Sequence, residues 1–203
     1  MMIRRLLVDP MHTRPVLAAA LAAAAIAGCA GAPGSPGPTS EYVVAALKPT
    51  RGNTTAGNVF FAQEGGDVVL RGRITGLKAN QVHGFHVHEK GDCSSDDAMS
   101  AGGHLNPDGK RHGPPTDEHH AGDIPSIKAD ENGVATVRAR IAGTLLGSGA
   151  ADIAGKALVV HASPDDYTTQ PTGNSGARIA CGVIGIGAGR DAAGNAVSIP
   201  KDL

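Results

Sequence analysis

Short segments in which apolar and polar residues alternate restrict the fold of this chain more than any other feature. The two clearest read DVVLRGRITGL (67–77) and GVATVRARI (133–141). Because successive side chains of a strand point to opposite faces, this alternation predicts strands that bury one face. The inward-facing residues of the second segment are expected to be Ala135, Val137, Ala139 and Ile141.

Similar segments lie at 42–47, 57–63, 156–162 and 177–186. Turn sequences separate neighbouring segments, such as EGG at 64–66. The chain has 29 glycines and 13 prolines but only 2 tyrosines, 3 phenylalanines and no tryptophan, which favours short strands, many turns and a mostly aliphatic core. We therefore predict one all-β domain, built as a sandwich or a barrel.

The first 28 residues are typical of an export signal. From Met11 the chain has a short basic start and then an apolar run over 16–27, which is too short to span a bilayer. The run ends in IAGC (26–29), which resembles the lipobox of bacterial lipoproteins and predicts that Cys29 is lipidated. The alternative is an ordinary secretory signal, in which Cys29 is removed or incidental. Translation could begin at Met1 or at Met11.

These features divide the chain into four parts. We expect a lipoprotein signal peptide over 1–28, the lipidated cysteine and a flexible linker over 29–40, a folded domain over 41–188 and a loose tail over 189–203. Lipidation would hold the exported protein at a membrane of the cell envelope, in the periplasm.

Charge and cysteine content limit the possible partners and the compartment. The net charge is −1, and loss of the leader, with its three arginines and one aspartate, changes it to −3. No basic patch indicates a nucleic-acid partner. Once Cys29 is set aside, only Cys93 and Cys181 remain, and in an oxidising compartment we expect a disulfide between them. Two free buried thiols are the alternative.

Histidines are concentrated in one part of the chain. Eight lie beyond the leader, seven of them between 83 and 120, and the eighth is His161. His86 and His88 are separated by one residue at the end of a predicted strand, so both imidazoles should project from one face. Two imidazoles on one face suggest a metal.

The stretch after this pair, 89–123, lacks strand periodicity, as does 162–176. Loops of this length inside a compact domain are usually functional or disordered. Three imidazoles and one carboxylate at intervals of eight, eight and three residues form a tetrahedral set suited to Zn²⁺. The residues of this set are His104, His112, His120 and Asp123.

Five motifs together resemble one known family, the copper/zinc superoxide dismutases. They are GFHVHEKGDC, AGGHLNP, the H-x-G-D pattern that ends at Asp123, LVVH ending at His161, and GARIACGVIGI, and they span roughly residues 41 to 186. The resemblance implies a Greek-key β-sandwich or flattened barrel, similar to the immunoglobulin fold, with two long functional loops. It also implies one copper and one zinc per subunit and the dismutation of superoxide anion to molecular oxygen and hydrogen peroxide.

The resemblance assigns a role to each ligand. The implied copper ligands are His86, His88, His104 and His161, and the implied zinc ligands are His104, His112, His120 and Asp123. His104 would bridge both metals and take part in catalysis by releasing reduced copper and accepting a proton. Because His119 adjoins His120, an exchange of these two ligands stays open.

Two more positions follow from the resemblance. Arg178 would lie beside copper and guide the anion, because its guanidinium keeps its charge and offers several donors. Asp165 would hydrogen-bond one ligand imidazole at each metal, and Asp166 is the alternative for that role.

The chain departs from the family in the second long loop. Relatives often carry lysine and glutamate there to steer superoxide, whereas YTTQPTGNSGA (167–177) has neither. The site would then either rely on Arg178 and the metals or recruit charge from elsewhere, such as Lys90 or Lys110. The protein could be a monomer or a homodimer. The alternative functions are a non-catalytic copper- or zinc-binding module of the same fold and a lipid-anchored adhesion domain, which would leave the placed ligands unexplained.

Overall fold

The computed structural model describes residues 42–187, which form an all-β fold, as predicted. The predicted signal peptide, Cys29, the linker and the tail over 189–203 lie outside the described residues, as do 41 and 188. One short 3₁₀ helix, η1, is present at Met99–Ala101. The strands are β1 (Tyr42–Pro49), β2 (Ala56–Glu64), β3 (Asp67–Thr75), β4 (Val82–His83), β5 (Phe85–His88), β6 (Ile127–Lys128), β7 (Ala135–Ala142), β8 (Ala157–His161) and β9 (Arg178–Gly187).

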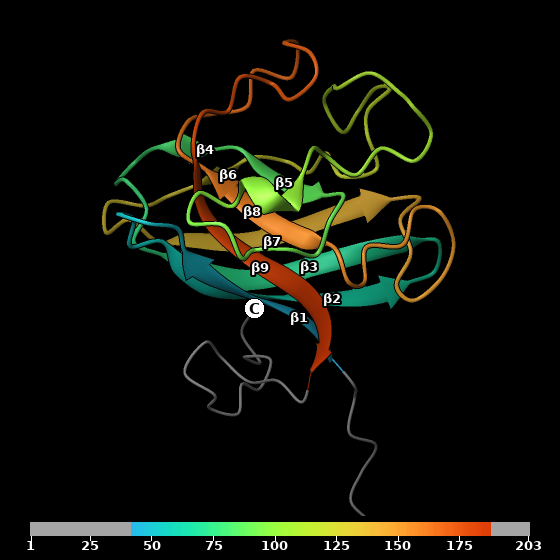
Figure 1. The fold of residues 1–203 in the computed structure, drawn as a ribbon, viewed down its shortest axis with the longest axis horizontal. Helices are drawn as coiled ribbons and strands as arrows, with labels where there is room; N and C mark the ends of the chain where they lie inside the picture. Colours follow the sequence, from blue (N-terminus) through green and yellow to red (C-terminus); the bar gives the residue numbers. More distant parts are fainter. Residues whose placement is uncertain (1–41, 188–203) are drawn as a thin grey trace, which may run out of the picture. The chain divides into compact units, whose positions relative to one another are not determined.

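Seven strands form one curled antiparallel sheet in the order β5-β8-β9-β1-β2-β3-β7, and β4 pairs with β6 in a second, two-stranded sheet (Figure 1). The last strand, β9, lies beside the first, β1, and the connection from β7 to β8 runs from one end of the strand order to the strand next to the other end. Such long connections between non-adjacent strands are those of a Greek-key arrangement. Within residues 42–187, no helix is long and apolar enough to cross a membrane.

The strand alternation read from the sequence is confirmed in β7. Ala135, Val137 and Ile141 are buried and Ala139 is half-buried, while the residues between them are exposed. The EGG sequence forms the tight turn between β2 and β3, where Glu64 pairs with Asp67. Gly65 has a φ of 63°, in the left-handed region that glycine adopts at low cost.

The core under the sheet is mostly aliphatic, as the composition predicted. Phe61 and Phe85 are the aromatic members of the main buried cluster, which otherwise contains valine, leucine, isoleucine and alanine. Val87 belongs to this cluster and is fully buried. Because side chains alternate along β5, burying Val87 in the core turns the two histidines beside it toward the opposite face.

Two long loops follow β5 and β8, and Figure 1 shows both on the same side of the sheet. The first runs over 89–126 and the second over 162–177. A disulfide joins Cys93 in the first loop to Cys181 in β9, with an S–S distance of 2.02 Å. The bridge ties the first loop to the strand that begins at Arg178.

Candidate metal centre

Two groups of four potential ligands lie on the loop-covered face of β5. In each group, one nitrogen or oxygen atom per residue lies within 4.8 Å of the corresponding atoms of the others, and all the residues are buried. The groups share one residue, His104. The first group is His86, His88, His104 and His161, and the second is His104, His112, His120 and Asp123.

Strand pairing positions the first group. His86 and His88 belong to β5, which pairs with β8, so that His86 lies opposite Val159. His161 is the last residue of β8, and its backbone N–H donates to the carbonyl of Gly84 at 2.9 Å, just before β5. Three of the four side chains therefore come from two adjacent strands, which gives them little freedom to move.

The second group is built by the first long loop. An isolated bridge pairs His88 with His104, and another pairs His86 with Asp123, so the loop lies along β5. Asp123 accepts the backbone N–H of His120 at 3.0 Å and that of Gly113 at 3.3 Å. The carboxylate thus organises the backbone that carries its neighbouring histidines.

After the ions that the resemblance assigns to them, the first group is called the copper-side group and the second the zinc-side group. Three of the copper-side histidines each use one ring nitrogen for a bond to the surrounding protein. His86 Nε2 donates to Asp165 at 2.6 Å, His88 Nδ1 to the Gly102 carbonyl at 2.9 Å, and His161 Nδ1 to the Gly176 carbonyl at 3.2 Å. These bonds leave His86 Nδ1 and the Nε2 atoms of the other two to face the cluster. The remaining Nε2 atoms of His88 and His161 lie 3.4 Å apart.

The zinc-side residues converge on one point, but several of their ring nitrogens have no hydrogen-bond partner. His112 Nδ1 lies 3.0 Å and His120 Nδ1 lies 3.3 Å from the Asp123 carboxylate, yet neither nitrogen has a hydrogen-bond partner. His104 Nδ1 lies 2.8 Å from the same carboxylate, and its Nε2 is buried and unpartnered.

Unpartnered buried nitrogens are rare in folded proteins, because each costs free energy unless something binds it. Among the described residues they occur on five histidines, and four of these, His86, His104, His112 and His120, belong to the two ligand groups. The fifth is His83 Nε2. Three histidines and one carboxylate suit Zn²⁺, and four imidazoles suit copper. The two donor sets therefore fit these ions.

Burial favours the neutral form of three copper-side imidazoles, those of His86, His88 and His161. It lowers the pKa of His86 to about 4 and that of His161 to about 3. It also lowers the pKa of His88, where the charge of Arg178 acts in the same direction. A neutral imidazole is the form that binds a metal, so these residues need to lose no proton at neutral pH.

The zinc side has the opposite electrostatics. Burial by itself would lower the pKa of His112, but the carboxylates of Asp123 and Asp165, one beside each ring nitrogen, raise it to about 9. Burial would likewise raise the pKa of each carboxyl, yet the neighbouring histidines hold both values well below the usual range. The metal-free protein thus keeps a proton between two ionised carboxylates, where a cation would replace it.

Arg178 lies beside the copper-side group. Its guanidinium donates to the carbonyls of Ala98 and Gly102, both at 2.6 Å. The Gly102 carbonyl also accepts from His88, so one backbone oxygen links the arginine to a copper-side histidine. Arg178 is half-buried, and its charge lowers the pKa of His161 as well.

The structure distinguishes the two pairs of adjacent residues between which the sequence left a choice, Asp165 or Asp166 and His119 or His120. Asp165 is buried and contacts the histidines of both groups, whereas Asp166 is exposed and accepts from Thr168 and Thr169. His120 lies in the cluster. His119 lies outside it, with Nδ1 directed to the Asp117 carbonyl at 2.8 Å.

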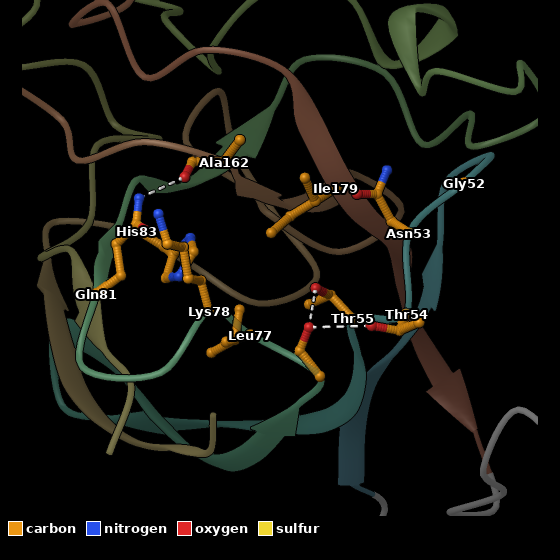
Figure 2. Close-up of a pocket in the computed structure, with 11 residues that line it drawn as sticks. Gly52, Asn53, Thr54, Thr55, Leu77, Lys78, Gln81, His83, Ala162 and Ile179 are labelled. Carbon is orange, nitrogen blue, oxygen red and sulfur yellow. Dashed lines mark hydrogen bonds between the residues drawn. The ribbon is translucent and has the colours of Figure 1, made fainter. Parts of the chain in front are cut away.

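His83 has a position that the sequence did not predict. It ends β4, is 1% exposed, and donates from Nδ1 to the carbonyl of His161 at 2.8 Å. Figure 2 shows it on the wall of a pocket of about 390 Å³, together with Lys78 and Gln81. His83 belongs to neither ligand group, but its hydrogen bond holds the backbone of His161, a candidate ligand.

Comparisons with known proteins agree with this geometry. The family model for copper/zinc superoxide dismutase matches residues 55–184. The "Superoxide dismutase [Cu-Zn] 2" of Brassica juncea is 44% identical over 151 residues, which cover 70% of this chain and 96% of that protein. The solved structure of the clock protein EA4 has 42% identity and a TM-score of 0.65 over 72% of this chain and 94% of its own. A SOD-like protein from Bacillus subtilis has 33% identity and a TM-score of 0.64 over 70% and 99%.

Proposed function

The chain belongs to the copper/zinc superoxide dismutase family, and from this premise we propose that it converts superoxide into molecular oxygen and hydrogen peroxide. Two superoxide anions and two protons would give one molecule of each product. The observation that carries the proposal is the pair of buried donor sets that share His104, with Arg178 beside the copper-side set. We further propose that His86, His88, His104 and His161 hold copper and that His104, His112, His120 and Asp123 hold zinc.

The residues of the chain would have separate tasks in this reaction. Bound copper would supply one-electron redox chemistry, and bound zinc a fixed positive charge. Arg178 would attract and orient the anion with a guanidinium that two backbone carbonyls hold in place. His104 Nε2, which has no protein partner, is the atom that would receive and return a proton.

The test is superoxide decay, followed directly with the protein loaded with one copper and one zinc per chain. Arg178→Ala should slow the decay about 10-fold or more, because removal of a focused positive charge reduces the encounter rate. Arg51→Ala is a matched control. Arg51 and Arg178 line one surface pocket, but Arg51 forms an ion pair with Asp96. A loaded wild-type protein that leaves the decay rate unchanged would contradict the proposal.

A metal-binding module without turnover is the second candidate. It is favoured by the likeness to proteins named for something other than this activity, such as the clock protein EA4. His161→Ala distinguishes the two. For an enzyme, the variant should lose activity while it retains zinc, because His161 belongs only to the copper-side group. For a binding module, the loaded wild-type protein and the His161→Ala variant would give the same rate of superoxide decay.

We also propose that the protein is exported and held at an envelope membrane through lipidated Cys29, as a monomer or a homodimer. The IAGC sequence supports the lipid, and the disulfide between Cys93 and Cys181 suits an oxidising compartment. Cys29→Ser should release the protein from the membrane fraction. Membrane retention of this variant would overturn the lipid assignment.

A further inference from the structure

We propose that Gln170 is a positioning residue for the zinc-side ligand His112, and that the second long loop (162–177) acts as a strap whose contacts fix the first, metal-binding loop. This inference rests on the proposed zinc site. The segment 167–177 of this loop contains no lysine, aspartate or glutamate. The loop that follows β8 must therefore contribute something other than charge from this segment.

The strap begins with a reciprocal pair of hydrogen bonds. The backbone N–H of His112 donates to Gln170 Oε1 at 2.8 Å, and Gln170 Nε2 donates back to the His112 carbonyl at 2.8 Å. The two residues are 58 positions apart in the chain. The side-chain amide thus pairs with the backbone of His112 in the way that a neighbouring strand would.

His112 needs such support because no strand holds it. It lies in the long loop between β5 and β6, whereas His86 and His88 lie within a paired strand. Its ring is fixed at Nε2 by Asp165 at 2.9 Å, which leaves Nδ1 toward the cluster. With the backbone fixed by Gln170 as well, both the position and the rotation of this imidazole are determined.

Tyr167 adds a second attachment within the same strap. Its ring is parallel to that of His112, with centroids 6.5 Å apart, and its hydroxyl accepts from the Ser126 N–H at 2.9 Å and donates to Ser126 Oγ at 3.0 Å. Tyr167 has a φ of 55°, which is unfavourable for a bulky side chain and persists only where surrounding contacts hold it.

The experiment compares Gln170→Met with Gln63→Met. Methionine keeps the length of glutamine but cannot form the two hydrogen bonds with the His112 backbone. Gln63 is a matched control because it also hydrogen-bonds backbone groups through both ends of its amide. Its Oε1 accepts the Leu146 N–H at 3.0 Å, and its Nε2 donates to two carbonyls at the turn after β2. None of these partners belongs to the metal groups. The measurements are amide hydrogen exchange in the metal-free protein and zinc affinity by competition with a chromophoric chelator.

For Gln170→Met, we expect faster exchange at the His112 amide and a fall of about tenfold in zinc affinity, the lower end of the effect of residues that orient metal ligands. Cobalt bound in place of zinc should show an altered visible spectrum. Gln63→Met should speed exchange at Leu146 and leave zinc affinity unchanged. Tyr167→Phe, which removes both hydrogen bonds of the hydroxyl to Ser126 but none to His112, is a milder change and should lower zinc affinity about threefold.

Two results would overturn the inference: zinc affinity in Gln170→Met within twofold of wild type, or an unprotected His112 amide in the wild-type protein. The second needs no variant, so it holds even if Gln170→Met does not fold. The readouts are independent of catalysis. A wild-type protein that binds zinc with a protected His112 but leaves superoxide untouched would refute the proposed function alone.

Discussion

Replacing Asp165 by alanine should weaken zinc binding about 10- to 100-fold and copper binding less. The carboxylate is buried and accepts from His86 at 2.6 Å and from His112 at 2.9 Å. Each bond joins an N–H to an ionised group and stabilises by about 1.5–3 kcal/mol, which equals about 10- to 100-fold in a binding constant. His86 is still held in β5 opposite Val159, whereas His112 lies in a loop and would lose the bond that sets its ring.

The assay is competition with chromophoric chelators for each metal, with circular dichroism to show that the variant is folded. Asp166→Ala is the control, because this adjacent carboxylate contacts only Thr168 and Thr169 in the described part of the chain. Zinc affinity within twofold of wild type in Asp165→Ala, or a larger loss for copper than for zinc, would refute the reasoning.

Three more predictions follow from the same structure. In the metal-free protein, NMR titration should show His112 protonated up to about pH 9 and His86 neutral down to about pH 4. Folding lowers the pKa of His86 from 6.5, so the free energy of unfolding should fall as the pH drops from about 6.5 to about 4. The fall should reach at most about 1.4 kcal/mol per pH unit for each such histidine. Chemical denaturation at several pH values tests this, and a flat profile would contradict it. Gly173→Ala should destabilise the fold and lower zinc affinity, because Gly173 has a φ of 65° and an added Cβ would collide with the buried groups around it; unchanged thermal unfolding and zinc competition would contradict this. Reducing the bridge between Cys93 and Cys181, which closes 88 residues, should cost about 4.5 kcal/mol by the chain-entropy model, and unfolding with and without reductant measures it.

Much of the fold could be predicted because its strands alternate clearly. The β7 segment shows the period of two directly, and the pair His86 and His88 required only that period to be placed on one face. The strands β4 and β6 were not predicted, since two residues are too few to show any period. Both exist only because the loops around them bring their backbones together.

The candidate site also has a part that the sequence predicts and a part that it does not. Ligand types and spacings can be read from a sequence, but Asp165 and Asp166 differ only in which one the loop turns inward. The role of Gln170 had no sequence signal at all, because a glutamine in a polar loop is ordinary and its partner is 58 positions away. Contacts of this kind depend on how two loops meet, which local pattern does not encode.

His104 gives one side chain to both donor sets, and this makes the two sites a thermodynamically linked system. If copper binding changes the affinity for zinc by some factor, zinc must change the affinity for copper by the same factor. Each ion that fixes the shared imidazole reduces the entropy that the other must remove. If the two groups bind copper and zinc as proposed, the two ions would not load independently, because one ring serves both donor sets.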